Sequence, residues 1–320
     1  MRRLLAATVL AFGFASGALA QAYPSKPIRI ITPYNPGGTA DIMARLVGQT
    51  LQDAWGQPVV VENKAGASGM IGADAVAKAA PDGYTLLAAY CTEIAIAPSL
   101  FPKVPYDPIR DLAPVAVTAL TPMILVMNPA LPAKNLKEFI ALAKAKPKQF
   151  AYASAGAGSP AHLAGELLQR AAGIEMTHVP YKGGGQALTD TLGGQTALFF
   201  SSMPSALPHV KAGKLRALAV STAARSPGAP EVPSVAEAGG FEFDMAAWNG
   251  LFAPAGTPRE IVNRVNAEVT KAFTRPEVRE RLVKEGAEPQ SWSADRFREF
   301  VVADTAKFGK VIRDAGVKAE

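Results

Sequence analysis

The segment IRIITPYNPGGTAD, residues 28–41, decides the fold. Its isoleucine-rich start predicts a buried strand, and the Pro-Gly-Gly loop that follows predicts a turn. Thr39 is a plausible N-cap for an amphipathic helix that carries Ile42, Leu46 and Leu51. A strand, a glycine loop and a helix N-terminus together can present backbone N–H groups to an anion without any charged side chain. Alternatively, the glycines serve only the backbone angles of a tight turn.

A second segment of the same construction favours the anion-binding interpretation. FAYASAGAGSPAHLAGE, residues 150–166, again places a short strand, Phe150 to Ser154, before a loop of small residues. Ser159 then stands at the N-cap with Pro160 at the first helical position, an arrangement that helix starts prefer. Two such loops, far apart in the chain, predict two lobes that close on one ligand.

The N-terminus has the pattern of a secretory signal peptide. A basic head at Arg2 and Arg3 precedes a short apolar run, which ends in Ala18-Leu19-Ala20. We therefore expect residues 1–20 to be removed and the protein to be exported to the periplasm. A membrane anchor is the alternative, but the run is short and ends in small residues.

Composition excludes several classes of protein. The 320 residues are 49% hydrophobic and 19% charged, which is an ordinary globular balance, and their number favours two lobes over one core. The formal charge of +6 would fall by two on removal of the signal peptide. The basic residues are dispersed, so we expect no nucleic-acid partner. Cys91 is the only cysteine and the three histidines are scattered, so we expect neither a disulfide nor a metal or cofactor site.

The order of elements predicts an α/β fold in two lobes. A β-α-β-α-β alternation ends near Tyr90, and such alternation implies a parallel sheet. The Pro-rich piece 98–108 reads as a surface loop, and residues 115–128 as a crossing to a second alternation. Residues 246–253 return to the first lobe before three closing helices. We expect the first lobe at 21–122 and 246–320, and the second at 123–245.

The chain resembles the solute receptors of tripartite tricarboxylate transporters, also called the Bug receptor family. The resemblance covers essentially the whole mature chain and is carried by landmarks in order, which are PSKPI (24–28), PGGTAD (36–41), APDGYT (80–85), GAGS (156–159), HLA (162–164), VPYKG (179–183), LGGQ (192–195) and APAGTP (253–258). It implies a two-lobe fold similar to a type II periplasmic binding protein. Ala197 departs from the family pattern, which usually has an acidic residue there.

The resemblance also implies how the ligand is held. Receptors of this family bind a ligand carboxylate in the cleft with loops of both lobes, mainly by backbone amides, hydroxyls and ordered water. That agrees with the two anion-competent loops of this sequence. The expected donors are, in the first lobe, Gly37, Gly38 and Thr39 and, in the second, Ala155, Gly158 and Ser159.

Other side chains are candidates with competing structural roles. Tyr34 is expected to wall the cleft, or else to pack under its loop. Asp41 suits the first turn of its helix and would brace the loop, since it would repel an anion, or else it would contact a cationic amine of the ligand. Trp248 belongs either to the cleft wall or to the core. The remaining candidates are His162 as a structural or ligand histidine, Tyr181 and Gly184 on the second-lobe floor, and Thr92 at a strand end near the cleft mouth.

We therefore expect an exported, monomeric, non-catalytic receptor that delivers a small carboxylate to membrane transporter subunits. Dicarboxylates, aromatic carboxylates and acidic amino acids are all open as ligands. A periplasmic sensor for a signalling receptor would need the same cleft, and deletion phenotypes would distinguish the two. A secreted hydrolase is the third hypothesis, but Ser68 and Ser159 lack a recognisable His/Asp partner in the sequence.

Overall fold

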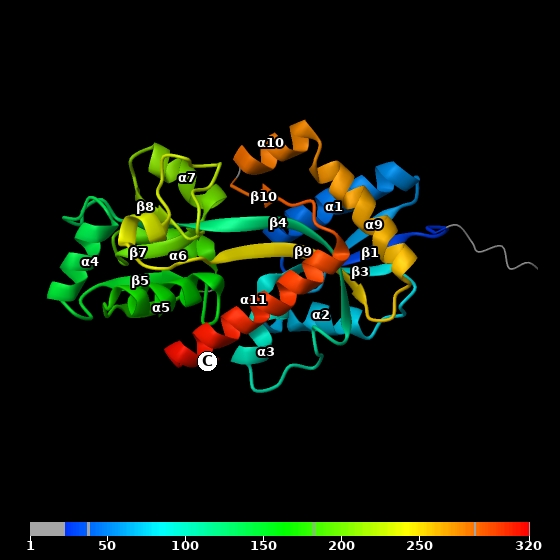
Figure 1. Cartoon of the computed structure of the whole chain (residues 1–320), viewed down its shortest axis with the longest axis horizontal. Helices are drawn as coiled ribbons and strands as arrows, with labels where there is room; N and C mark the ends of the chain where they lie inside the picture. The colour runs from blue at the N-terminus through cyan, green and yellow to red at the C-terminus, as the bar shows by residue number, and fades with distance from the viewer. Residues whose placement is uncertain (1–22, 37–38, 182, 285, 320) are drawn as a thin grey trace, which may run out of the picture.

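The computed structural model describes residues 23–36, 39–181, 183–284 and 286–319, which form a mixed α/β fold of two lobes joined by long strands (Figure 1). The predicted signal peptide, residues 1–20, lies outside the described residues, as do Gly37 and Gly38. The strands are β1 (Ile28–Thr32), β2 (Val59–Asn63), β3 (Thr85–Tyr90), β4 (Leu112–Met127), β5 (Ala151–Ser154), β6 (Thr177–Pro180), β7 (Leu198–Ser202), β8 (Arg216–Val220), β9 (Ala246–Pro254) and β10 (Glu288–Pro289).

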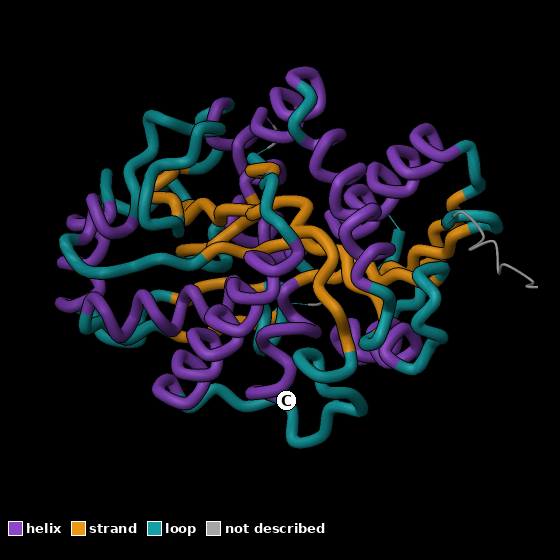
Figure 2. Tube along the Cα trace, turned by 45° about the vertical axis from the view of Figure 1, so that its right-hand side comes forward, coloured by secondary structure: helices purple, strands orange, loops and turns teal. Residues whose placement is uncertain are grey.

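The helices cover the sheet on both of its faces (Figure 2). They are α1 (Thr39–Trp55), α2 (Met70–Ala77), α3 (Ala97–Leu100), α4 (Leu136–Ala145), α5 (Pro160–Ala172), α6 (Gly184–Leu192), α7 (Met203–Lys211), α8 (Val235–Gly239), α9 (Arg259–Phe273), α10 (Pro276–Lys284) and α11 (Ala294–Ala315). A 3-10 turn at Ala67–Gly69 precedes α2, and a π-helix at Thr92–Ile96 precedes α3. In the described part of the chain, no helix has both the length and the apolarity needed to span a bilayer.

The first lobe is built around β1, whose isoleucines are buried on both faces of the sheet. β1 lies between β2 and β3 and is parallel to both, so the predicted β-α-β-α-β unit is confirmed. Helix α1 packs on this sheet through Met43, Val47 and Leu51, spaced four residues apart on one face. The prediction that Ile42 lies on that face was wrong, because the stripe starts one residue later and leaves Ile42 46% exposed.

The second lobe repeats the pattern around β5, which is parallel to β6 and β7. Helix α4 precedes β5, and Asn135 caps it by accepting the Glu138 N–H. Ser159 caps α5 and Pro160 occupies its first turn, as the sequence predicted. The local capping chemistry therefore fixed these helix starts.

Strands β4 and β9 are the long strands that link the lobes (Figure 1). β4 is 16 residues long, and its segment 112–122 pairs antiparallel with β9. Its last segment, 123–127, pairs antiparallel with β7 and β8 instead. The sheet is therefore mixed, with parallel strands in each lobe and antiparallel strands between them.

Three helical segments were missed by the sequence analysis. The expected loop at 98–108 was wrong at its start, since the chain is helical from Thr92 to Leu100. Helices α7 and α8 were not predicted either. Pro204 and Pro208 argue against a helix at α7 in the sequence. Pro204 nevertheless fits the first turn, and Pro208 lies inside the helix.

The C-terminal helix α11 packs across β4, the π-helix and α5, and so touches both lobes. Trp248 of β9 is fully buried beneath it, and the Trp248 Nε1–H donates to Asp304 Oδ2 of α11 at 2.7 Å. Trp248 is therefore a core residue and not a wall of the cleft. Beside it, Phe297 of α11 lies over the backbone of Gly250, where a Cβ would stand 2.4 Å from the Phe297 ring.

Gly250→Ala should destabilise the protein by about 1–3 kcal/mol, because the added methyl overpacks the contact between β9 and α11. The measurement is urea unfolding followed by circular dichroism. Gly193→Ala is the matched control, because a Cβ there meets its nearest atom at an ordinary 3.6 Å. Equal midpoints for Gly250→Ala and wild type would show that α11 does not seal against β9.

Candidate ligand-binding site

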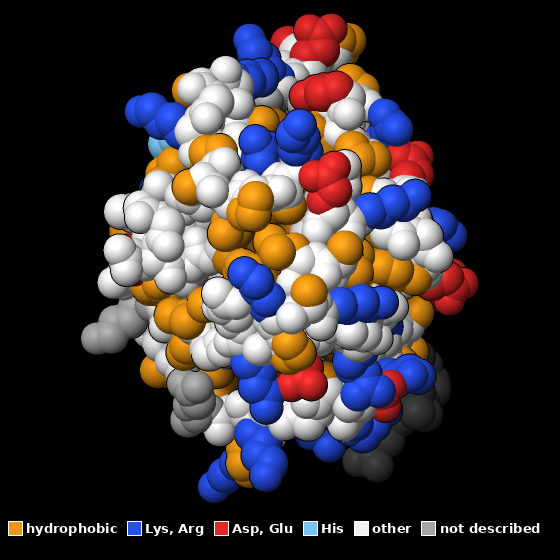
Figure 3. Space-filling view, turned by 90° about the vertical axis from the view of Figure 1, so that its left-hand side faces the viewer, with side chains coloured by type: hydrophobic (Ala, Val, Ile, Leu, Met, Phe, Trp, Pro, Cys, Tyr) orange, Lys and Arg blue, Asp and Glu red, His pale blue; other side chains and the backbone are white. Residues whose placement is uncertain are grey.

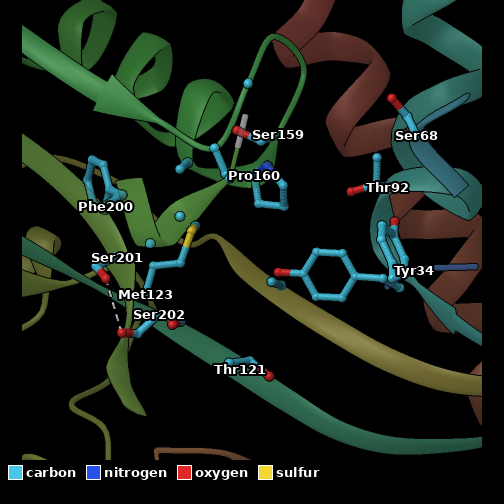
Figure 4. Close-up of a pocket in the computed structure, with 18 of the residues that line it drawn as sticks. Tyr34, Ser68, Thr92, Thr121, Met123, Ser159, Pro160, Phe200, Ser201 and Ser202 are labelled. Carbon is cyan, nitrogen blue, oxygen red and sulfur yellow. Dashed lines mark hydrogen bonds between the residues drawn. The ribbon is translucent and has the colours of Figure 1, made fainter. Parts of the chain in front are cut away.

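A cavity of about 960 Å³ opens between the two lobes. Figure 4 shows Ser159 across this cavity from Ser68 and Thr92. The lining residues come from both lobes and from β4 and β9 where they cross, and they are Tyr34, Asn35, Pro36, Ser68, Tyr90, Thr92, Phe101, Thr121, Met123, Ala155, Gly156, Ala157, Ser159, Pro160, Ala161, Gly183, Gly184, Gly185, Phe199, Phe200, Ser201, Ser202, Ser205, Ala247 and Ala319. Among these described residues, none has a charged side chain.

Three helices of the second lobe start at the cavity. The first turns of α5, α6 and α7 contribute Ala161, Gly185 and Ser205 to its lining. The first N–H groups of a helix have no acceptor within that helix, and the helix dipole makes this end positive. Three such ends around one cavity form a strong site for an anion without a basic side chain.

Hydroxyl groups supplement these helix ends. Ser159 Oγ accepts the His162 N–H at 3.3 Å, so the hydroxyl proton of Ser159 is free to donate into the cavity. Across the cavity, Ser68 lies in the left-handed region at φ 52°, and Thr92 begins the π-helix. The walls between are apolar and include Met123, Phe199 and Phe200.

Two stacked histidines lie behind the loop at 155–159. The His162 and His178 rings are nearly parallel, with centroids 3.7 Å apart. His162 Nδ1 accepts the Gly158 N–H at 3.0 Å, and His178 Nε2 lies 2.7 Å from Ser154 Oγ. Because the Gly158 N–H donates to His162, it stabilises the loop and does not point to the cavity as a free donor.

Glycine is required at position 158 for two reasons. Its backbone φ is +72°, which side chains adopt poorly, and a Cβ would lie 1.9 Å from Leu100 Cδ2. Leu100 belongs to α3 of the first lobe, so this close approach joins the two lobes at the edge of the cavity.

The histidine pair is held neutral. Burial lowers the pKa of His162 to about 4, helped by the neighbouring His178, and burial alone lowers the pKa of His178 to about 4. A neutral His162 keeps a lone pair on Nδ1 for Gly158. Protonation of that nitrogen would remove the acceptor.

Glu93 is a functional candidate that the sequence analysis missed. It is fully buried behind the first-lobe wall. The Tyr34 hydroxyl donates to Glu93 Oε2 at 2.6 Å, and the Tyr90 N–H donates to Oε1 at 2.7 Å. Burial raises the pKa of Glu93 to about 7, although these hydrogen bonds oppose the shift. The available signal was that Glu93 is the lone charged residue in the apolar run 86–97.

The structure brings together part of the predicted site. The candidates that line the cavity are Tyr34, Thr92, Ala155, Ser159 and Gly184. Gly158 and His162 lie directly behind this lining, and Tyr181 lies outside it. Gly37 and Gly38 lie outside the described residues. Thr39 begins α1, and its side chain also lies outside the description.

Asp41 braces the first-lobe loop, one of the two roles considered for it. Its carboxylate is buried and accepts hydrogen bonds from the Arg45 guanidinium at 3.0 Å. Asn63 Nδ2 joins Asp41 Oδ1 at 2.8 Å and the Tyr34 carbonyl at 2.9 Å. The carboxylate thereby links α1 to the end of β2 and to the loop after β1.

Within the described ranges, no three His, Cys, Asp or Glu side chains gather in a way that could hold a metal ion. On the face shown in Figure 3, Lys and Arg side chains are scattered among acidic and apolar ones.

Known proteins are similar to this chain in sequence and fold. A model of the tripartite tricarboxylate transporter family receptor matches residues 43–317. BugT of Bordetella pertussis is 41% identical, with 99% of each chain covered. Rpa4515 of R. palustris, solved with adipate, is 35% identical at a TM-score of 0.84 and covers 92% of this chain and 99% of its own. MatC of Rhodopseudomonas palustris, solved with bound malate, is 34% identical at a TM-score of 0.78, covering 91% of this chain and 100% of its own.

Stability should depend on the histidine pair at acid pH. Each imidazole has a folded pKa of about 4, below the usual histidine value of 6.5. Its contribution is therefore complete above pH 6.5, is lost as pH falls from about 6.5 to about 4, and levels off below that. His178→Phe keeps a ring in the stack but removes one titrating group.

The measurement is the free energy of unfolding in urea between pH 8 and pH 4 for both proteins. The acid loss in His178→Phe should be smaller by on the order of 2 kcal/mol, after allowance for partial solvent exposure. Removal of His178 also relieves the part of the His162 pKa shift that His178 causes, which lessens the acid loss in the same direction, and the groups that do not contact the pair cancel in the difference. Parallel pH profiles would show that His178 titrates alike in the folded and unfolded chain.

Proposed function

This chain belongs to the tripartite tricarboxylate transporter receptor family, and from that premise we propose that it captures a small carboxylate for delivery to a membrane transporter. Proteins of this family are binding receptors and not enzymes, and the same holds for this protein. Its receptors are periplasmic solute-binding proteins.

One observation carries the proposal. The N-termini of α5, α6 and α7 open on a single cavity whose described lining has hydroxyls and no charged side chain. Helix ends each contribute about 0.3–1 kcal/mol to anion binding, and up to ~2 kcal/mol when partly buried. Uncharged donors of this kind hold a carboxylate while still releasing it, which a receptor that feeds a transporter requires.

Relatives support the choice of ligand class. Adipate and malate are the ligands of Rpa4515 and MatC, and both are dicarboxylates. The apolar wall of Met123, Phe199 and Phe200 suits a short carbon chain or an aromatic ring. Dicarboxylates, aromatic carboxylates and acidic amino acids are therefore the ligands that we propose.

We propose that the lobes divide where β4 changes partners. The first lobe would comprise 21–122 and 246–320, and the second 123–245. Support comes from the pairing of β4, which is with β9 up to Pro122 and with β7 from Met123 onward. Closure of the lobes would bring Leu100 of α3 against Gly158, the contact that the structure holds. We further propose that the receptor acts as a monomer.

Ser159→Ala should weaken carboxylate binding by about ten- to a hundredfold, because a hydrogen bond to a charged group contributes roughly 1.5–3 kcal/mol. The measurement is isothermal titration with adipate, malate, aspartate and benzoate, using whichever of these binds the wild type. Loss of the helix cap costs about 1 kcal/mol of stability as a separate effect.

Ser293→Ala is the matched control for Ser159→Ala. Ser293 caps α11 by accepting the Arg296 N–H at 3.2 Å, and it lies outside the cavity lining. The control should lose a similar amount of stability and keep its affinity. Equal affinity of Ser159→Ala and wild type would remove Ser159 from the site.

Export gives an independent prediction. The basic head, apolar run and Ala18-Leu19-Ala20 of the sequence should direct cleavage after Ala20. Osmotic shock of expressing cells should release a protein that begins at Gln21, as read by mass spectrometry. Periplasmic material that retains Met1, or a protein that stays in the membrane fraction, would contradict export by cleavage.

A further inference from the structure

The first-lobe wall of the cavity conceals one carboxyl group, that of Glu93. The residue is fully buried. Its Oε2 accepts from the Tyr34 hydroxyl at 2.6 Å, and its Oε1 accepts from the Tyr90 N–H at 2.7 Å. In the part of the chain that the structure describes, no Lys, Arg or His side chain pairs with Glu93. A negative charge on this residue is therefore stabilised by neutral donors and is not balanced by a counter-charge.

One layer of side chains separates Glu93 from a ligand. Tyr34 and Tyr90, which both donate to Glu93, line the cavity, and their rings meet edge to face with centroids 6.2 Å apart. Figure 4 shows Tyr34 beside Thr92 on the first-lobe wall. A ligand that touches this wall therefore touches the residues that hold Glu93. The described lining has no charged side chain that could come between the two.

Solvent does not screen the charge of Glu93, because the surrounding segments pack closely on it. Gly69, in the loop before α2, leaves the space that the carboxylate fills, since a Cβ there would stand 2.9 Å from Glu93 Oε2 and 3.1 Å from the Tyr34 hydroxyl. The Tyr106 hydroxyl donates to the Glu93 carbonyl at 2.7 Å. Charges interact more strongly in such an interior than at a hydrated surface.

The other titratable groups around Glu93 are either neutral or paired. The neutral ones are phenols and a thiol whose pKa burial raises, and they are Tyr34, Tyr90, Cys91 and Tyr106. The acidic ones, on the surrounding helices α1, α2 and α11, each have a basic partner within 3.1 Å, and these pairs are Asp41–Arg45, Asp74–Lys78 and Asp304–Lys307. Among these described groups, Glu93 is the unpaired acid.

We propose that binding of a carboxylate to this receptor is coupled to the uptake of one proton by Glu93. The inference rests on the proposed function and describes the regulation of that same site. An anionic ligand and an ionised Glu93 repel one another across the first-lobe wall, whereas a protonated Glu93 does not repel the ligand. By linkage, the ligand then favours protonation of Glu93, and protonation favours the ligand to the same extent.

The hydrogen bonds of Glu93 allow this protonation without loss of a contact. The proton comes from solvent and settles on Oε2, because Oε1 must stay an acceptor for the Tyr90 N–H. Oε2–H then donates to the Tyr34 oxygen, since a phenol hydroxyl can accept as well as donate. Both forms of Glu93 are therefore fully hydrogen-bonded, and the difference between them is the charge.

The coupling should act near neutral pH. Burial raises the pKa of Glu93 to about 7 in the free protein, and an anion in the cavity would raise this pKa further. Two like charges about 10 Å apart, at an effective dielectric constant of about 20, change an equilibrium by about tenfold. Affinity should therefore be highest below pH 7 and fall by about five- to tenfold between pH 6.5 and pH 9 as Glu93 ionises.

The direct measurement is the number of protons taken up per ligand. Isothermal titration of the wild type at pH 7.5 in phosphate, HEPES and Tris gives this number, because the heat varies with the ionisation enthalpy of the buffer that supplies the proton. The probes are adipate, malate, aspartate and benzoate, whose carboxyl groups are already ionised at this pH. We expect uptake of about half a proton per bound ligand.

Glu93→Gln imitates the protonated residue. Its amide keeps an acceptor for the Tyr90 N–H and a donor for the Tyr34 oxygen. The variant should take up no proton, bind equally well at pH 6.5 and pH 9, and bind about five- to tenfold more tightly than the wild type at pH 9. Structural damage would instead weaken binding at every pH. Thermal unfolding checks that the variant is folded.

Glu288→Gln is the matched control. Burial also raises the pKa of Glu288, which accepts from Ser226 at 2.9 Å and lies outside the cavity lining. This variant should keep the proton number and the pH dependence of the wild type. His162 and His178 do not contribute, because their pKa of about 4 leaves them neutral throughout this range.

The outcomes distinguish the inference from the proposed function. A wild type that binds without proton uptake, or a Glu93→Gln protein with the wild-type proton number, would overturn the coupling and leave the carboxylate receptor intact. Failure of the wild type to bind any of the four probes would overturn the proposed function, and the inference with it. Uptake by the wild type that is lost in Glu93→Gln and kept in Glu288→Gln would support both. The wild-type measurement needs no variant, so it decides the matter even where Glu93→Gln does not fold.

Discussion

The antiparallel pairing of β4 with β9 is the contact on which the rest of the structure depends. β4 pairs with β9 through Pro122 and with β7 from Met123 onward, so one strand belongs to both lobes. The cavity lies at that handover, where Thr121, Met123 and Ala247 form part of its lining. Helix α11 seals this crossing from one side through the Trp248 hydrogen bond to Asp304. The position of the cavity is therefore set by backbone pairing, whereas its chemistry is set by side chains.

The two sides of the cavity differ in their electrostatic character. Helix N-termini supply positive potential in the second lobe, where fixed dipoles attract an anion without the desolvation cost of a buried cation. In the first lobe, a carboxylate is hidden behind a tyrosine, and burial raises its pKa to about 7. Each side achieves its polarity through neutral groups at the surface of the cavity. Specificity and release are thereby compatible, because the ligand meets no formal charge among the described lining residues.

The loop at 155–159 shows how packing supports this arrangement. Gly158 donates its N–H to His162, and the stacked His178 holds that ring in place. The positive φ of Gly158 and the nearby Leu100 side chain leave no room for a Cβ. The residue thus shapes the loop from behind while Ser159 faces the cavity. A glycine that reads in sequence as a ligand donor acts in the structure as a contact between lobes.

The sequence by itself determined the elements that local chemistry controls. Capping residues such as Ser159 and Asn135 fixed helix starts, alternation of strands and helices predicted both parallel units, and the landmarks indicated the receptor family. Only the tertiary structure decided which residues meet. It placed Tyr181 outside the cavity lining, paired the Gly158 N–H with His162 and buried Glu93 behind the cavity wall. These outcomes could not be predicted, because burial and hydrogen-bond direction depend on segments distant in the chain. Local periodicity cannot report such contacts, since Tyr34 and Glu93 lie 59 residues apart and are brought together only by the pairing of β1 with β3.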